Sequence, residues 1–274
     1  MGARSDPRRV LRVGTGPVGW RPDQVAVEAP LSLVIDGAVV ATTMRTPGHD
    51  VELALGWLVG EGVLIHRDDV LAVRAGDERT VEIALAVGVE PPGRRLGLTV
   101  SACGLCGVDD LDAVAARLDA APRPDGADTV DVEVLLSLPE RLRAAQPLFD
   151  RTGGLHAAGW FSRDGEVLLV REDVGRHNAL DKLVGALWER DQLPAADGVL
   201  ALSGRASYEL VAKAFMAGMR VVVAVSAPST AAVDLAREHG ITLVGFVRGG
   251  GANVYAGEQR LAGVAAAQGL RALP

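Results

Sequence analysis

The chain has 274 residues, of which 49 % are hydrophobic and 4 % aromatic, and its formal net charge at pH 7 is −7. This length is sufficient for a sizeable core and for two domains, while the negative charge argues against general affinity for nucleic acid. No uninterrupted apolar stretch approaches the roughly 18–20 residues that cross a membrane. The composition therefore predicts a globular protein that binds neither nucleic acid nor membrane.

The first 122 residues predict a tail and a small domain. Arg4, Arg8, Arg9 and Arg12 lie near the start without a long apolar stretch after them, so residues 1–28 are expected to form a flexible basic tail and no secretory signal. Two strands, a helix and two more strands are expected in residues 29–122, at 31–35, 38–43, 50–60, 70–75 and 80–87. The Asp36-Gly37 dipeptide favours a tight hairpin turn between the first two strands. This order predicts a β-grasp-like α/β roll.

The chain contains two cysteines, Cys103 and Cys106, which lie three residues apart between glycines. Four interpretations are open: a structural zinc site, a thioredoxin-like redox pair, a disulfide or two incidental thiols, and a catalytic pair that handles sulfur. A zinc site needs two more ligands, and the sequence offers no second cysteine pair and no closely spaced histidine pair. In a sulfur-handling pair the second thiol attacks whatever the first has bound. The pair favours sulfur chemistry without a bound metal, in the reducing cytoplasm.

A second and larger domain is expected over residues 127–274, after the proline-containing stretch 121–126. It begins with a helix at 132–146 and a hairpin of strands at 156–161 and 166–172. Helices and strands then alternate, with helices at 177–189, 207–217 and 229–239 and strands at 198–202, 220–225 and 241–247. Repeated strand–helix–strand units predict a mainly parallel sheet between helices.

Four loops of this domain follow strand ends, at 173–178, 203–207, 226–230 and 247–251. In an open α/β sheet the crevice beyond the strand ends is the usual ligand site, and free N–H groups at helix N-termini bind phosphates. Three of the loops also hold an arginine, namely Arg176, Arg205 and Arg248. The loops therefore favour a ligand of the nucleotide polyphosphate type.

Two histidines, His156 and His177, flank glycine-rich bends and are candidates for ligand binding or proton transfer. Asp173, Asp181 and Lys182 lie around the same helix as His177. For these three residues structural salt bridges are the better interpretation.

Several segments in one order make the chain similar to the formate dehydrogenase accessory sulfurtransferase family, FdhD. The resemblance runs from about residue 29 to residue 257. Its motifs are Arg45-Thr-Pro-Gly48, Leu53-Ala-Leu-Gly-Trp-Leu58, Ser101-Ala-Cys-Gly-Leu-Cys-Gly107, Thr152-Gly-Gly-Leu-His156, Asp173-Val-Gly-Arg-His-Asn-Ala-Leu-Asp-Lys182, Ser203-Gly-Arg-Ala-Ser-Tyr-Glu209, Ser226-Ala-Pro228 and Gly245-Phe-Val-Arg-Gly249.

The resemblance implies a cytidine-deaminase-like three-layer α/β domain after the smaller roll, and a homodimer. It implies that Cys103 carries a persulfide, receives its sulfur from a cysteine desulfurase and passes it to the bis(molybdopterin guanine dinucleotide) molybdenum cofactor before that cofactor enters formate dehydrogenase. Apart from the resemblance, the chemistry of the pair predicts that Cys106 either attacks Cys103 and so supplies the two electrons that sulfide release needs, or only tunes the pKa of Cys103. The resemblance implies that Phe246, Val247, Arg248, Gly249, Gly250 and Gly251 bind the cofactor, and the loop and histidine patterns add His177 and Arg205 to the expected cofactor-binding residues.

Two other classes of function remain open. A zinc deaminase shares the expected fold, but the sequence lacks the Pro-Cys-x-x-Cys and His-x-Glu elements that this catalysis needs. A non-catalytic chaperone of the molybdenum cofactor needs only the phosphate-binding loops, with the cysteine pair serving as a redox sensor.

Overall fold

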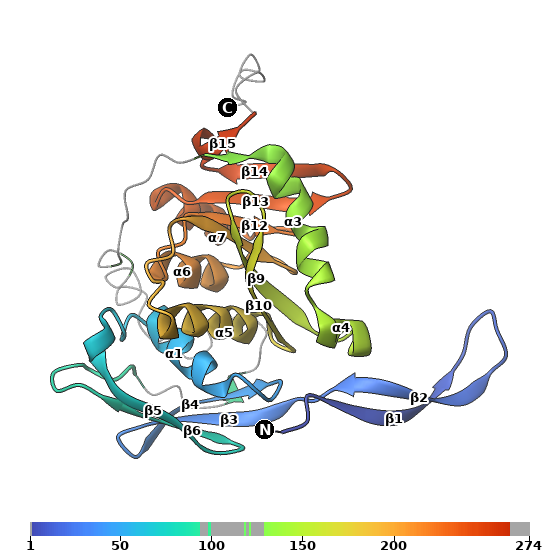
Figure 1. Ribbon diagram of the computed structural model, residues 1–274, viewed down its shortest axis with the longest axis horizontal. Coiled ribbons are helices and arrows are strands. Elements are labelled where there is room, and N and C mark those ends of the chain that lie inside the picture. Colours follow the sequence, from blue (N-terminus) through green and yellow to red (C-terminus); the bar gives the residue numbers. More distant parts are fainter. Residues whose placement is uncertain (1, 94–97, 100–117, 119–120, 122–128, 264–274) are drawn as a thin grey trace.

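The computed structural model of the protein describes residues 2–93, 98–99, 118, 121 and 129–263. These residues form two larger β-sheets with helices between and beside them (Figure 1). Cys103, Cys106 and the expected domain boundary at 122–127 lie outside the described residues. None of the helices in the described part of the chain is long and apolar enough to cross a bilayer.

The first sheet has five strands in the order β5-β6-β3-β4-β7. Their bounds are Ala29–Ile35 for β3, Ala38–Arg45 for β4, Val70–Asp77 for β5, Thr80–Leu85 for β6 and Leu98–Thr99 for β7. Asp36 and Gly37 both have positive φ, 48° and 80°, as a type I′ turn requires, and this confirms the predicted hairpin. Helix α1, Asp50–Gly60, and a short 3₁₀ turn, Arg67–Asp69, follow β4 and precede β5, so the predicted order of elements is correct.

The second sheet has six strands in the order β10-β9-β11-β12-β13-β14. Their bounds are His156–Ser162 for β9, Val167–Asp173 for β10, Gly198–Leu202 for β11, Val221–Ala224 for β12, Thr242–Arg248 for β13 and Gly251–Ala256 for β14. Strands β11, β12 and β13 are parallel to one another, whereas β9, β10 and β14 are antiparallel to their neighbours. The prediction of a mainly parallel sheet holds only for the three central strands, because short turns with left-handed glycines, Gly165 and Gly249-Gly250, join the outer strands directly.

Helices cover both faces of this six-stranded sheet (Figure 1). On one face α5, Arg176–Glu189, α6, Tyr208–Met216, and α7, Thr230–Glu238, pack against Trp160 and Leu200; on the other, α3, Val132–Ala144, packs against Phe161 and Val199. A short helix α4, Pro147–Thr152, follows α3, and a small parallel pair of β8, Val130–Asp131, with β15, Leu261–Ala262, lies next to the 3₁₀ turn Glu258–Arg260. The layout is a mixed α/β fold; its cytidine-deaminase-like and β-grasp-like descriptions stay predictions.

Helices α1 and α5 cross with their backbones in contact. A Cβ atom built on Gly56 of α1 would lie 1.8 Å from the carbonyl oxygen of Asp181, and one built on Gly185 of α5 would lie 1.8 Å from that of Glu52. Only glycine permits this approach. One hydrophobic cluster therefore runs from the first sheet through α1 and α5 to the second sheet, so the two predicted domains share a core.

The N-terminal segment, expected to be a flexible tail, is instead an antiparallel ribbon. Strands β1, Ser5–Arg12, and β2, Gly19–Ala26, pair in register along their full length, and the ribbon projects from the body of the molecule (Figure 1). The Arg9 guanidinium lies 5.3 Å from the centre of the Trp20 ring. Such cross-strand contacts stabilise a ribbon that has little buried surface, and no hydrophobic core pattern marks it in the sequence.

Candidate functional site

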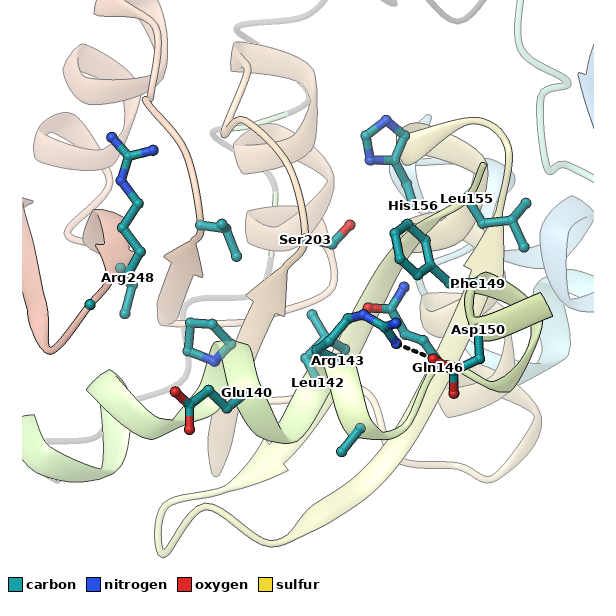
Figure 2. Close-up of a pocket in the computed structure, with 15 residues that line it drawn as sticks. Glu140, Leu142, Arg143, Gln146, Phe149, Asp150, Leu155, His156, Ser203 and Arg248 are labelled. Atoms are coloured by element: carbon teal, nitrogen blue, oxygen red, sulfur yellow. Dashed lines mark ion pairs between the residues drawn. The ribbon is translucent and has the colours of Figure 1, made fainter. Parts of the chain in front are cut away.

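The carboxyl ends of β11, β12 and β13 border a cavity of about 710 Å³. Helices α3 and α4 form its opposite wall, and β9 begins beside it (Figure 2). A cavity of this size falls within the range of small-molecule sites. The lining residues are Pro139, Glu140, Leu142, Arg143, Ala144, Gln146, Phe149, Asp150, Leu155, His156, Ser203, Val225, Val247, Arg248 and Gly249.

The end of β13 and the turn after it contribute three of the predicted cofactor-binding residues to this lining: Val247, Arg248 and Gly249. Phe246 has φ of 54°, a strained conformation for a bulky residue, and its N–H donates to the carbonyl oxygen of Ser226 at 3.1 Å. The pairing of β13 with β14 also shifts register between Gly245 and Arg248. Such an irregularity redirects side chains, and here Val247, which is buried, and Arg248, which is exposed, both border the cavity.

The other predicted cofactor-binding residues are not part of the cavity lining. Phe246 lies beside the cavity turn with its ring centre 5.5 Å from the Arg248 guanidinium, and Gly250 and Gly251 complete the turn into β14. Arg205 is exposed on the loop between β11 and α6. The structure thus places Val247, Arg248 and Gly249 in the cavity lining and the other predicted cofactor-binding residues outside it.

His177 lies buried at the start of α5. Its Nε2 atom is 3.3 Å from Ser207 Oγ and 3.2 Å from Glu209 Oε2. Both partners belong to the start of α6, on the face of the sheet opposite α3. His177 therefore supports the junction of α5 and α6 rather than the cavity wall.

His156, at the start of β9, does line the cavity. Burial, followed by the positive charge of Arg176, lowers the pKa of His156 below its usual value, although Asp173 acts in the opposite direction. A neutral imidazole can both accept and donate a hydrogen bond. A Cβ atom on the neighbouring Gly204 would lie 3.3 Å from the Nδ1 atom of His156, so glycine lets the loop after β11 pass close to the ring.

The α3–α4 wall of the cavity was not anticipated from the sequence. The Gln146 side chain is 3 % exposed, and the Arg143 guanidinium lies 4.4 Å from the centre of the Phe149 ring and 2.6 Å from the Asp150 carboxylate. Glu172 on β10 fixes the start of α4, since its carboxylate accepts the N–H groups of Leu148 and Phe149 at 3.0 and 2.7 Å. The only local signal for this wall is the Gln146-Pro147 dipeptide, where one helix ends and the next begins.

The salt bridges predicted around α5 are confirmed. Lys182 Nζ lies 2.7 Å from Asp173 Oδ2 and donates to the carbonyl oxygen of Thr46 at 2.7 Å. Asp173 also accepts the Thr46 N–H at 3.0 Å, which ties the Arg45-Thr-Pro-Gly48 motif to the start of α5. Burial lowers the pKa of Lys182 although the Asp173 carboxylate opposes this. These motif residues join the two halves of the molecule.

A second buried pair involves Asp181, the residue directly before Lys182 on the same helix. Asp181 accepts a hydrogen bond of 2.6 Å from Lys213 on α6. Burial opposes the charge of Lys213, but Asp181, Glu209 and Glu61 outweigh it and raise the pKa of Lys213. Among the described residues there is no cluster of three or more histidine, cysteine, aspartate or glutamate side chains that could hold a metal ion.

The fold and the cavity define a mixed α/β protein with a ligand-sized site at the carboxyl edge of its central strands. The chain belongs to the FdhD/NarQ family, whose family model matches residues 26–262. It is 50 % identical over 284 residues to the sulfur carrier protein FdhD of Streptomyces avermitilis, covering 98 % of this chain and 100 % of that protein. It is 48 % identical over 276 residues to the sulfur carrier protein FdhD of Mycobacterium tuberculosis, covering 95 % and 100 %.

The fold is similar to a crystal structure described as a formate dehydrogenase accessory protein from Desulfotalea psychrophila. The TM-score is 0.77 at 20 % sequence identity, and the match covers 94 % of this chain and 100 % of that one. At this identity the likeness concerns the fold alone. The family expected from the sequence motifs is confirmed by the family model and by the identity to the sulfur carrier proteins.

Proposed function

We propose that the protein is a sulfurtransferase that carries sulfur as a persulfide on Cys103 and delivers it to the bis(molybdopterin guanine dinucleotide) molybdenum cofactor before insertion into formate dehydrogenase. One observation carries this proposal. A chain that matches sulfur carriers over almost its whole length contains two cysteines, and both lie in one Cys-Gly-Leu-Cys segment.

The sulfur step begins with the Cys103 thiolate attacking the outer sulfur of a persulfide on a cysteine desulfurase. The S–S bond of that persulfide breaks, the cysteine of the desulfurase leaves as a thiolate, and Cys103 becomes Cys103–S–SH. The carried sulfur is formally neutral, whereas a molybdenum ligand is sulfide, so delivery needs two electrons. Attack by the Cys106 thiolate on the Cys103 sulfur supplies them, releases sulfide and leaves a disulfide that an external thiol must reduce.

The cavity supports the cargo part of the proposal. Arg248 offers a cation and Gly249 an accessible backbone at the carboxyl edge of the sheet, which suits the diphosphate of a guanine nucleotide. His156 and Ser203 add polar side chains on the neighbouring loops. Phe246, Gly250, Gly251, His177 and Arg205 remain proposed cofactor residues around this edge. The homodimer and the cytoplasmic location belong to the same proposal.

Mass spectrometry tests the sulfur step. After incubation with a cysteine desulfurase and cysteine, wild-type protein and Cys106→Ser should each gain the mass of one sulfur atom, and Cys103→Ser should gain none. Persulfide formed on Cys106 at normal yield in Cys103→Ser would contradict the assignment. A Cys103→Ala protein that still supports sulfuration of the cofactor would favour the non-catalytic chaperone.

A further inference from the structure

The side-chain amide of Gln146 is a buried donor in the cavity wall. Its Nε2 atom is inaccessible to solvent and has no hydrogen-bond partner within the described chain. Gln146 nevertheless lines the cavity (Figure 2). A buried donor without an acceptor destabilises a protein by about 1–3 kcal/mol, so its presence beside a large cavity points to an acceptor on a ligand.

The side chains around Gln146 favour a ring over a freely charged group. Leu142, Leu155 and Phe149 line the cavity with Gln146, and the Arg143 cation on this wall is paired with Asp150 and lies over the Phe149 ring. An acceptor that fits among such side chains is a carbonyl on a heterocyclic ring rather than a phosphate. A primary amide can donate to a ring carbonyl and accept from the adjacent ring N–H, which are the two groups of a lactam.

A second cation, Arg248, lies at the other end of the cavity, whereas Arg143 at this end is paired with Asp150. In Figure 2, Arg248 lies on the far side of the cavity from Phe149 and Asp150. A ligand with a ring at α4 and an anionic group at the turn after β13 would fill both ends. Separation of the two ends also means that ring and anion recognition can be tested by different substitutions.

We propose that the α3–α4 wall recognises the lactam edge of a 2-amino-4-oxopyrimidine ring, with Gln146 Nε2 donating to the ring carbonyl. Guanine and pterin share this edge. The choice of ring rests on the proposed function, because the proposed cargo contains both. Gln146 is then a residue that determines specificity, a role separate from that of the sulfur-carrying cysteine.

Calorimetry with GDP, 6-hydroxymethylpterin and ADP tests the proposal and separates the two sources of the ring. Adenine has an amino donor where guanine has its carbonyl, so ADP is the mismatched probe. Wild-type protein should bind GDP, the pterin or both more tightly than ADP, and Gln146→Leu should weaken the matched ligand by about tenfold, as one lost hydrogen bond predicts. Gln146→Glu, which keeps the shape but replaces the donor, should lower the preference over ADP.

Thermal unfolding without ligand provides a second readout. Gln146→Leu removes a buried donor without a partner and should leave the melting temperature unchanged or raise it. Gln192→Leu, on the surface, is the matched control and should bind like wild type. A clearly lower melting temperature for Gln146→Leu, or equal affinity of wild type and Gln146→Leu for both rings, would overturn the proposal. Either result leaves sulfur uptake by Cys103 untouched, and loss of that uptake would not affect ring binding.

Discussion

The contact of α1 with α5 and the cavity at the sheet edge differ in how completely their polar groups are satisfied. At the helix contact, Lys182, Asp173 and Thr46 complete one another's hydrogen bonds in full burial. In the cavity, Gln146 keeps a donor without a partner in the described structure and Arg248 is exposed. The motifs around Thr46 and Lys182 therefore hold the first sheet and the second sheet together, whereas the cavity keeps polar groups that a ligand could contact.

The largest effect is expected from Lys182→Met. This change leaves the Asp173 carboxylate buried without its cation, which costs about 3–5 kcal/mol of unfolding free energy. Urea unfolding measures the loss. The control is Arg74→Met, because Arg74 and Glu82 form a pair whose side chains are 78 % and 43 % exposed, and its loss should be below about 1 kcal/mol. Equal losses of unfolding free energy for Lys182→Met and Arg74→Met would show that the buried pair stabilises the fold no more than an exposed one.

Gly56→Ala should follow closely, since its methyl group collides with the backbone of Asp181 rather than with a movable side chain. We expect a loss of about 3 kcal/mol, at the upper end of the cost of overpacking. A Cβ atom built on Gly16 would meet no other group within 4 Å, so Gly16→Ala should change stability by less than about 0.5 kcal/mol. A Gly56→Ala protein as stable as Gly16→Ala would show that the helices can separate without cost.

Arg248→Ala should affect ligand binding instead of stability. Loss of a charge-assisted hydrogen bond weakens GDP binding by about 1.5–3 kcal/mol, while the melting temperature stays at the wild-type value because the side chain is exposed. Calorimetry and thermal unfolding measure the two quantities. Arg205→Ala is the comparison variant: a similar loss of affinity there would extend the site to the loop after β11, and unchanged binding by Arg248→Ala would place it elsewhere.

The smallest effect is a pH dependence from Glu52 on α1. Burial raises the pKa of Glu52, but hydrogen bonds from Arg171 and His49 outweigh it and lower the pKa from 4.5 to about 2. A carboxyl group with a lowered folded-state pKa stabilises the fold above its unfolded pKa and loses that contribution as pH falls from about 4.5 to about 2. Glu52→Gln should therefore lose about 1 kcal/mol near pH 7 and converge with wild type near pH 2.

Urea midpoints measured from pH 2 to pH 7 check this convergence. Glu166 is exposed, and Glu166→Gln should follow the wild-type curve throughout. A constant difference between Glu52→Gln and wild type across the range would mean that the contact with Arg171 does not depend on the charge of Glu52.

Local signals in the sequence predicted the parts of the fold that depend on local geometry. Asp36-Gly37 specified a hairpin because few dipeptides adopt two positive φ values. The opposite charges of Asp173, just before α5, and Lys182, within α5, indicated a salt bridge around that helix. The α3–α4 wall has no such signal. Gln146 becomes a cavity residue only when α3 packs across β13, a contact between segments about a hundred residues apart. The ribbon of β1 and β2 was not predicted, because its strands bury too little surface to require the alternation of hydrophobic and polar residues that marks a strand against a core.

The shared core of α1 and α5 has a consequence for the order in which the protein matures. Thr46 and Lys182 are bonded across 136 residues of sequence, so the first sheet cannot complete its packing until α5 has been synthesised. We therefore expect that the N-terminal half does not fold co-translationally as an independent unit, and that apolar α1 side chains stay exposed in nascent chains that end before α5. Separately produced halves should acquire cooperative unfolding only when they are combined, as complementing fragments of one folding unit.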